Sequence, residues 1–293
     1  MELIDGKWLS KEIKKEIAAQ VDQIIAGGGK QPHLAAVLIG EDPASQVYVR
    51  NKVKACDLVG FKSTLIKKDA SISEAELLQI VEDLNNDPDI DGFIVQLPLP
   101  KHIDEIKVTL AIDPKKDVDG FHPMNVGRMT IGLPAYLPAT PFGIMQMLDK
   151  YHINVAGKEC VVLGRSNIVG TPISLLLSRK ANPGNATVIL CHSMTQNIKD
   201  LCRRADVLVV AMGKPLFVTA DMVKEGAVII DVGMNRIDDP SAPKGTRLVG
   251  DVDFDAVADK CSFITPVPGG VGPMTITSLL MNTLKANQKE IYG

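Results

Sequence analysis

The sequence predicts an α/β protein made of two lobes, each built around a parallel sheet. Short apolar runs of strand length alternate with amphipathic stretches at helical spacing along most of the chain, as repeated βα units do. The alternation is interrupted once, between residues 113 and 138, by an irregular stretch dense in proline, glycine and aspartate. The 293 residues, 45% of them hydrophobic, are enough to form two cores.

The first lobe is expected over residues 1–139 and should contain a β-α-β-α-β arrangement. Ser73 and Glu76 form a capping box, in which each side chain accepts from the backbone N–H of the other residue, so a helix should start there. The other elements are expected as helices at 10–26, 44–59 and 102–112 and strands at 34–39, 61–66 and 92–96. Residues 113–138 are expected to be a site-forming loop and a linker.

The second lobe is expected over residues 140–274 and should be a Rossmann-type nucleotide-binding sheet. Thr140 and Pro141 predict the start of a helix that runs to about Tyr151. Strands are expected near 160–163, 187–191, 207–211, 228–232 and 262–265. The last helix, at 275–293, follows a rigid turn of prolines and glycines.

The turn after the first strand of the second lobe has the features of an anion site. Gly164 ends the strand, Gly170 lets backbone approach a ligand, and Thr171 and Pro172 suit a helix cap and a first helical residue. A helix that begins there points free N–H groups at the turn, where a dinucleotide phosphate would bind. The spacing differs from G-x-G-x-x-G, so an ordinary βα turn is the alternative. A nucleophile elbow is excluded because Ile168 occupies the position of its last glycine.

The residues around this turn favour NADP over NAD. An NAD site normally has an acidic residue after the second strand to hold the ribose hydroxyls. Here that strand ends in His192 and Ser193, and the next acidic residue is Asp200. Arg165 and Ser166 on the turn suit a 2′-phosphate.

Composition excludes several other classes. The formal net charge of −3, without long basic runs, argues against nucleic acid as a partner. The five cysteines form no C-x-x-C pair and the five histidines are scattered, so no metal site is expected and the thiols should be buried in a reducing compartment. No apolar run is long enough for a membrane span or a signal peptide, which predicts a soluble, cytoplasmic protein.

Four residues of the first lobe are candidates for chemistry. Tyr48 and Lys52 are four apart on a predicted helix and share one face, as an ordinary surface pair or as an acid/base pair. Short-chain dehydrogenases use such a pair, but in that family the glycine loop comes first in the chain. Gln96 at a strand end and Asp119 before a glycine are otherwise an ordinary polar group and a turn former.

Five motifs together closely resemble the bifunctional methylenetetrahydrofolate dehydrogenase/methenyltetrahydrofolate cyclohydrolase family, almost from end to end. They are Tyr48-Val-Arg-Asn-Lys52, Val95-Gln-Leu-Pro-Leu-Pro100, Lys116-Asp-Val-Asp-Gly120, Gly164-Arg-Ser166 and Pro266-Val-Pro-Gly-Gly-Val-Gly-Pro-Met-Thr275. The resemblance implies a homodimer of one-carbon metabolism, with folate in a cleft between the lobes and the last helix packed on the first lobe. The implied reactions are NADP-dependent oxidation of methylenetetrahydrofolate and hydrolysis of the methenyl product to 10-formyltetrahydrofolate.

The same resemblance implies the roles of individual residues. Tyr48 stacks on the folate, Lys52 is the acid or base, Gln96 holds and tunes Lys52, and Asp119 binds the pterin. The remaining folate contacts are implied at Val95, Leu97, Pro268, Gly269, Gly270 and Val271, and the NADP contacts at Gly164, Arg165, Ser166, Gly170, Ser193 and Met234. Met234 stands where members often have a branched apolar residue. Another NADP oxidoreductase using Tyr48 and Lys52, and an NADP-binding module without activity, are the competing hypotheses.

Overall fold

The computed structural model describes residues 1–242 and 245–292, which divide into two compact units. The three-stranded unit comprises residues 11–139 together with the chain from residue 276 onward. The six-stranded unit comprises residues 1–10 and 140–275. Two of the three boundaries fall inside α1 (Gly6–Ala26) and α10 (Val271–Asn287), so each of these helices contributes residues to both units, and the third follows the first residue of α6 (Ala139–Lys150).

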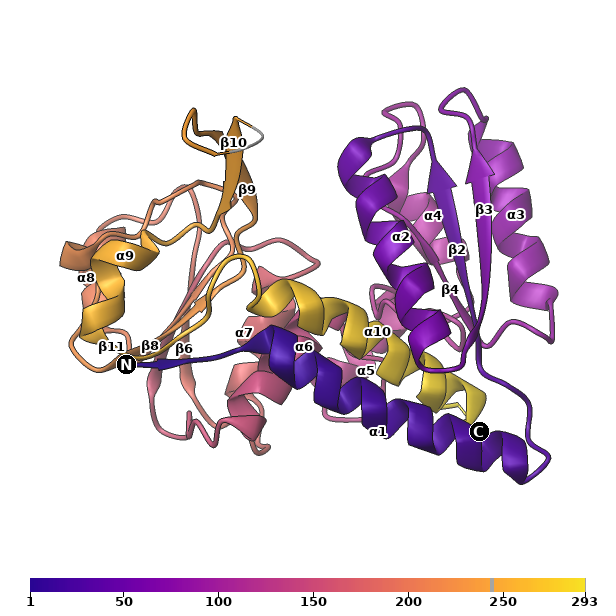
Figure 1. The fold of residues 1–293 in the computed structure, drawn as a ribbon, viewed down its shortest axis with the longest axis horizontal. Coiled ribbons are helices and arrows are strands. Elements are labelled where there is room, and N and C mark those ends of the chain that lie inside the picture. Colours follow the sequence, from indigo (N-terminus) through magenta and orange to yellow (C-terminus); the bar gives the residue numbers. More distant parts are fainter. Residues whose placement is uncertain (243–244, 293) are drawn as a thin grey trace. The chain divides into compact units, whose positions relative to one another are not determined.

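The three-stranded unit contains a parallel sheet, as the sequence predicts, and its strand order is β3-β2-β4. Its elements are β2 (His33–Ile39), β3 (Lys62–Lys68), β4 (Gly92–Val95), α2 (Pro43–Leu58), α3 (Glu74–Asn86), α4 (Glu105–Ala111) and α5 (Pro123–Thr130). Strand β2 is buried along its whole length because helices cover both faces, with α2 and α3 on opposite sides in Figure 1. Alternate residues Ala35, Val37 and Ile39 pack into the core that includes side chains of α3 and α4.

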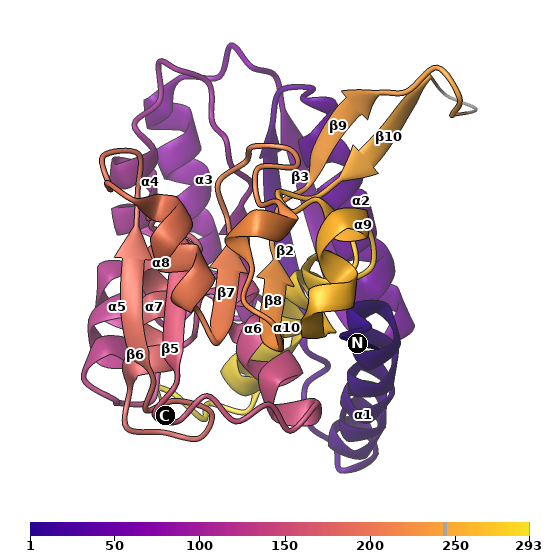
Figure 2. The ribbon, with the colours of Figure 1, turned by 90° about the vertical axis from the view of Figure 1, so that its left-hand side faces the viewer.

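The six-stranded unit contains a sheet of parallel pairs in the order β1-β11-β8-β7-β5-β6. The strands are β1 (Glu2–Leu3), β5 (Glu159–Leu163), β6 (Thr187–Cys191), β7 (Val207–Val210), β8 (Ala227–Asp231) and β11 (Cys261–Ile264). The helices are α6 (Ala139–Lys150), α7 (Gly170–Ser178), α8 (Ile198–Arg204) and α9 (Phe254–Val257), with 3-10 turns at Ala220–Met222 and Ala258–Lys260. Figure 2 shows α8 and α9 in front of the strands.

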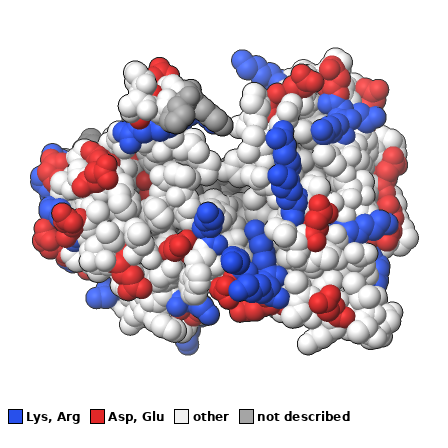
Figure 3. Space-filling view, in the orientation of Figure 1, with Lys and Arg blue, Asp and Glu red and all other residues white. Residues whose placement is uncertain are grey.

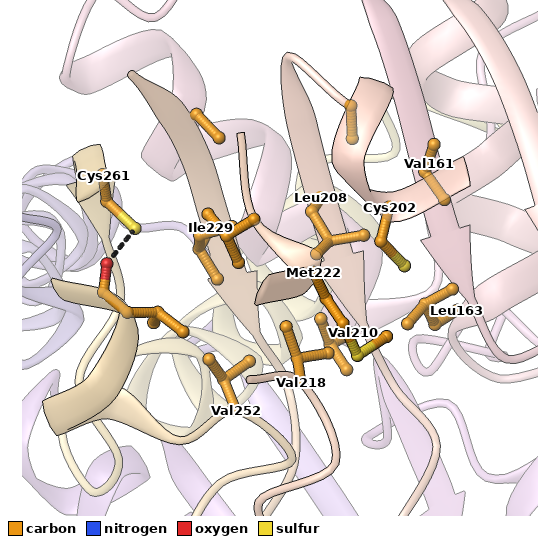
Figure 4. Packing of buried hydrophobic residues seen from close by; sticks show 14 of the residues in the cluster. Val161, Leu163, Cys202, Leu208, Val210, Val218, Met222, Ile229, Val252 and Cys261 are labelled. Carbon is orange, nitrogen blue, oxygen red and sulfur yellow. Dashed lines mark hydrogen bonds between the residues drawn. The ribbon is translucent and has the colours of Figure 1, made fainter. Parts of the chain in front are cut away.

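The core of the six-stranded unit shows why these strands read as apolar runs. Val161, Leu208 and Ile229 project from three neighbouring strands toward Cys202 and Met222, as Figure 4 shows. Side chains on both faces of such a sheet are buried, so the runs contain little polar alternation. All five cysteines are buried and none is in a disulfide, as expected.

Several elements differ from the prediction, each for a local reason. Helix α1 begins at Gly6 and not at Ser10, because the Asp5 carboxylate accepts a hydrogen bond from Trp8 N–H at 2.8 Å. Helix α5 lies inside the stretch predicted to be irregular, where the His122 ring accepts from Met124 N–H at 3.0 Å and Pro123 opens the first turn.

Two further helices have other boundaries than predicted, and three short strands were not predicted. Helix α4 (Glu105–Ala111) is shorter than the predicted 102–112, because the Asp104 carboxylate caps its start by accepting from Ile106 N–H at 2.9 Å. Strand β1 and the hairpin of β9 (Asn235–Asp238) and β10 (Thr246–Val249) were not predicted, because each is too short to show a period. Helix α10 begins at Val271 and not at residue 275, and it ends at Asn287, short of the predicted end at residue 293.

Acidic and basic side chains both occur on each unit on the face shown in Figure 3. Among the described helices, none is both long and apolar enough to cross a bilayer.

Candidate active site

Helix α2 carries the tyrosine and lysine that the sequence singles out. The Asp42 carboxylate caps it by accepting from Ser45 N–H at 2.7 Å. Tyr48 and Lys52 lie one turn apart on the same face, Tyr48 partly buried and Lys52 only 7% exposed. Burial of the lysine does not fit the alternative of a solvated surface pair.

Gln96 contacts Lys52 from the end of β4. Its backbone N–H extends the sheet by donating to the carbonyl of Val37 at 2.9 Å. Its side-chain Nε2 donates to the carbonyl of Leu97 at 2.7 Å, which leaves Oε1 to accept from Lys52 Nζ at 3.2 Å. Gln96 therefore orients the lysine amine with a neutral acceptor that serves both protonation states.

The surroundings change the pKa values of the lysine and of Asp119. Burial lowers the pKa of Lys52, because desolvation disfavours the ammonium, and the charges of Asp119 and then of Cys56 oppose this. Burial raises the pKa of Asp119, and the positive charge of Lys52 opposes that rise. Both shifts move the pKa of the group toward neutrality relative to exposed groups of the same types, which suits acid/base chemistry.

A second carboxylate in the same motif holds the loop that carries Asp119. Asp117 is 2% exposed and accepts from the N–H groups of Phe121 at 3.2 Å and His122 at 2.8 Å and from Asn125 Nδ2 at 2.9 Å. Burial raises the pKa of Asp117 to about 7, against these hydrogen bonds. The sequence analysis missed Asp117, although it stands two residues before Asp119 in the same motif.

Three of the predicted folate residues line one small cavity in this unit. Val95, Leu97 and Asp119 contribute to a volume of about 20 Å³, enough for a single water molecule. Among the described residues that line this cavity, neither Tyr48 nor Lys52 is present.

A larger cavity in the six-stranded unit lies at the carboxyl ends of three neighbouring strands. It has a volume of about 300 Å³, and its lining includes Gly164, Arg165, Ser166 and Ser193 from the predicted nucleotide site. The strand order reverses beside β5, since β6 lies on one side and β7 on the other. Ligands of open α/β sheets bind at such a reversal.

The glycine turn has no room for side chains. Gly164 has a φ of +107°, and a Cβ there would lie 2.1 Å from the carbonyl oxygen of Ala211. Helix α7 begins at Gly170, where a Cβ would lie 1.8 Å from the carbonyl oxygen of Gly164. Strand, turn and helix therefore pack backbone against backbone at these two positions, and only glycine fits at either of them.

The predicted cap of this helix is wrong. Val169, and not Thr171, is the N-cap residue, so Thr171 and Pro172 lie inside the first turn. Val169 makes no side-chain capping hydrogen bond, and Ser166 supplies the acceptor in its place: its Oγ accepts from Val169 N–H at 3.2 Å and Gly170 N–H at 3.4 Å.

A Gly170→Ala substitution tests this packing. The added methyl group meets backbone atoms, so we expect the free energy of unfolding to fall by roughly 1–3 kcal/mol and dinucleotide affinity to fall with it. Gly127→Ala is the control, since a Cβ there has no neighbour within 4 Å among the described residues. Thermal unfolding and dinucleotide titration measure both effects. Equal unfolding temperatures for Gly170→Ala and the unchanged protein would refute the packing argument.

Two cationic or polar residues of the large cavity were missed by the sequence analysis. Lys214 and His192 line it together with Arg165, and among the described lining residues none is acidic. His192 could have been predicted, because it directly follows the second strand of this sheet, β6. Lys214 lies in the loop after β7, and no motif in the sequence marks it. The lining suits an anionic ligand with an additional phosphate.

The two remaining predicted contacts lie elsewhere in the same unit. The 268–271 turn is held by the first residues of the chain, since Lys7 N–H donates to the Gly269 carbonyl at 2.8 Å and a Cβ on Gly6 would lie 1.9 Å from the Gly270 carbonyl oxygen. Met234 is 44% exposed after β8, and it is not among the described residues that line the large cavity.

Together these features define a dinucleotide-dependent enzyme with a nucleotide-binding sheet and a second α/β unit that carries a buried lysine. The family model described as tetrahydrofolate dehydrogenase/cyclohydrolase, catalytic domain, matches residues 4–119, and the model of its NAD(P)-binding domain matches residues 138–291. The chain belongs to the tetrahydrofolate dehydrogenase/cyclohydrolase family, which confirms the resemblance seen in the sequence.

Individual relatives match over their full lengths. The bifunctional protein FolD of Cytophaga hutchinsonii is 64% identical over 98% of this chain and 99% of its own, and that of Bacteroides fragilis is 60% identical over 100% of both. The crystal structure of the Campylobacter jejuni FolD dehydrogenase/cyclohydrolase is 45% identical over 99% of both chains, with a TM-score of 0.93. The Trypanosoma brucei enzyme, solved with NADP and an inhibitor, is 38% identical over 99% of this chain and 98% of its own, with a TM-score of 0.93.

Proposed function

We propose that this chain oxidises 5,10-methylenetetrahydrofolate with NADP and then hydrolyses the 5,10-methenyl product to 10-formyltetrahydrofolate. The observation that carries the proposal is the buried Lys52, held by Gln96 and with its pKa lowered by desolvation. It is supported by membership of the family and by the relatives named above as bifunctional.

The two units divide the work in this proposal. We assign the folate domain to residues 1–139 with the last helix, and the NADP domain to residues 140–274; residues 1–10 of the assigned folate domain pack within the six-stranded unit. Arg165, Ser166 and Ser193 hold the phosphates of the cofactor over the glycine turn, because the cavity there presents cations and hydroxyls. Bound NADP supplies the hydride acceptor of the first reaction.

The residues of the three-stranded unit align folate and move protons. In the first reaction, Tyr48 stacks on the substrate and Asp119 accepts from the pterin, so the reacting carbon is fixed in place. In the second reaction, the neutral Lys52 amine takes a proton from water as the water oxygen bonds to the cationic methenyl carbon. The ammonium then returns this proton to the folate nitrogen whose bond to that carbon breaks, and the proton that remains on the former water oxygen is released to solvent as the formyl C=O forms. Gln96 keeps the amine directed through both transfers.

Two absorbance assays test this function. Methenyltetrahydrofolate should appear when the protein is mixed with NADP and methylenetetrahydrofolate. In a second assay without NADP, added methenyltetrahydrofolate should disappear faster with the protein than in buffer alone. Oxidation without hydrolysis would leave a dehydrogenase alone, and absence of both would remove the proposal.

An Arg165→Ala substitution tests the choice of NADP. Loss of charge-assisted hydrogen bonds to the 2′-phosphate should weaken NADP binding roughly ten- to a hundredfold, while NAD, which has no such phosphate, is affected little. Initial rates with the two cofactors measure the ratio, and Lys180→Ala, another exposed cation of the same unit, is the control. Equal initial rates with NADP and NAD in the unchanged protein would contradict the assignment.

We also place the enzyme in the cytoplasm as a homodimer. The five buried thiols without disulfides fit a reducing compartment. Sedimentation of the purified protein at several concentrations tests the dimer.

A further inference from the structure

Two carboxylates buried beneath the loops of the six-stranded unit have no part in the chemistry proposed above. Asp251 is 0% exposed and Asp231 is 3% exposed, and both lie in the loops or strand ends at the carboxyl side of the sheet. Burial of ionisable groups is unfavourable unless each oxygen finds donors. The donors that hydrogen-bond to the two carboxylates therefore identify the segments that these residues fix in place.

Asp251 joins two loops that are distant in sequence. Its Oδ2 accepts from the backbone N–H groups of Met212 at 2.6 Å and Gly213 at 2.9 Å, immediately after β7. Its Oδ1 accepts from Asn235 Nδ2 at 2.8 Å, at the start of the β9–β10 hairpin. One carboxylate thus fixes the loop after β7 against the loop after β8.

Asp231 holds Asp251 in turn. The Asp231 carboxylate accepts from the N–H groups of Gly233 at 2.9 Å, Asp251 at 3.0 Å and Val252 at 3.0 Å. The packing admits no side chain on two neighbours, since a Cβ on Gly250 would lie 1.7 Å from Asp231 Oδ2 and one on Gly233 would lie 2.5 Å from Asp251 Oδ1. Asp251 is consequently confined in position and orientation.

The loop that Asp251 holds forms a wall of the large cavity. Met212 and Lys214 line that cavity, and the Ala211 carbonyl oxygen fits against Gly164, where a Cβ would be 2.1 Å away. Residues 211–214 therefore border both the cavity and the glycine turn, so a shift of this segment would change the shape of the cavity and the packing of the turn. Asn235, the other partner of Asp251, directly follows Met234.

We propose that Asp251 is a positioning residue for the dinucleotide: it sets the loop after β7 and the loop after β8 at the spacing that the cofactor needs, without touching the cofactor itself. The inference rests on the assignment of the large cavity to NADP. It separates cofactor binding from the folate chemistry of Lys52, which belongs to the other unit.

A reciprocal exchange tests the hydrogen-bond pattern. In Asp251→Asn the negative charge is lost and an NH₂ group replaces one acceptor. Asn235 Nδ2 and the two backbone N–H groups are all donors in this structure, so the new NH₂ finds an acceptor only if the Asn235 amide turns its oxygen toward it. NADP should then bind roughly ten- to a hundredfold more weakly. In Asn235→Asp two carboxylates meet, and a similar loss is expected. In the double variant Asp251→Asn/Asn235→Asp, the amide oxygen at position 251 can accept from the two backbone N–H groups, and its NH₂ can donate to the carboxylate at position 235. NADP affinity should therefore return to within about threefold of the unchanged protein.

The readout separates positioning from general stability. NADP affinity is measured by titration, and hydrolysis of added methenyltetrahydrofolate, which uses no NADP, is measured on the same samples. We expect the single variants to lose NADP affinity and to keep the hydrolysis rate within about twofold, because Lys52 lies in the other unit. Asp255→Asn, an exposed carboxylate nearby in the chain, is the control. If Asp251→Asn is insoluble, Asn235→Asp and the double variant carry the comparison.

Three outcomes would overturn the inference: unchanged NADP affinity in both single variants, a parallel loss of affinity and hydrolysis, or a double variant no better than the singles. Arg165→Ala separates this failure from that of the proposed function. If Arg165→Ala weakens NADP while the Asp251 set does not, only the positioning role is lost. If neither affects NADP, the large cavity is not the cofactor site.

Discussion

Replacing Lys52 with glutamine is expected to slow hydrolysis of added methenyltetrahydrofolate by roughly a hundred- to ten-thousand-fold, while oxidation of methylenetetrahydrofolate stays measurable. Glutamine retains length and a hydrogen bond toward Gln96 but cannot carry a proton. Hydride transfer requires alignment and no proton carrier, so the first reaction should depend on Lys52 much less. Both rates are measured on one preparation.

The control for this substitution is Lys54→Gln, which changes an exposed lysine on the same helix. It should leave both rates unchanged. Hydrolysis by Lys52→Gln at the rate of the unchanged enzyme would show that Lys52 is not the proton carrier, and the buried contact with Gln96 would then be structural.

Replacing Asp119 with alanine should damage both reactions. The loss of a charge-assisted hydrogen bond to the pterin weakens folate binding by roughly 1.5–3 kcal/mol, before any misalignment of the reacting carbon is counted. Folate affinity and the two rates are the measurements, with Asp22→Ala on an exposed position of α1 as the control. Unchanged affinity and rates would leave Asp119 as a turn former.

The same variant should change the pH dependence of the residual hydrolysis. The Asp119 charge raises the pKa of Lys52, so its removal lets that pKa fall further below the usual range. The neutral amine then predominates at lower pH, so the limb of the rate profile on the acid side, where the rate rises as the lysine loses its proton, should move to lower pH. A shift to higher pH would contradict the electrostatic coupling of these two groups.

Local patterns account for most of the agreement between sequence and fold. The capping box of Ser73 and Glu76 appears as predicted, since both partners lie within one turn of helix. The parallel pairing of β2 with β3 and β4 also follows from the alternation of strands and helices, because a strand reached through a helical crossover runs parallel to the one before it. Helix α5 was missed because its signals, a capping histidine and a proline, stand among residues typical of loops.

The candidate site was predictable only in part. Arg165, Ser166 and Ser193 could be placed together because the carboxyl ends of neighbouring parallel strands share one edge of a sheet. Lys214 and Asp251 gave no such signal, because each acts through loops that are brought together only by the strand order. Residue roles in folate binding came from the family resemblance and await the variants described above.

The sequence by itself determined the two α/β units, the family and the set of candidate residues, because apolar periodicity, helix caps and glycine turns are local properties that the chain displays directly. The tertiary structure alone decided which of those residues act on one another. Lys52 is buried against Gln96, which lies 44 residues away in the chain. Asp251 holds the loops after β7 and β8, and its partner Met212 lies 39 residues away. Such contacts depend on desolvation and on long-range packing, and neither leaves a period or a motif in the sequence.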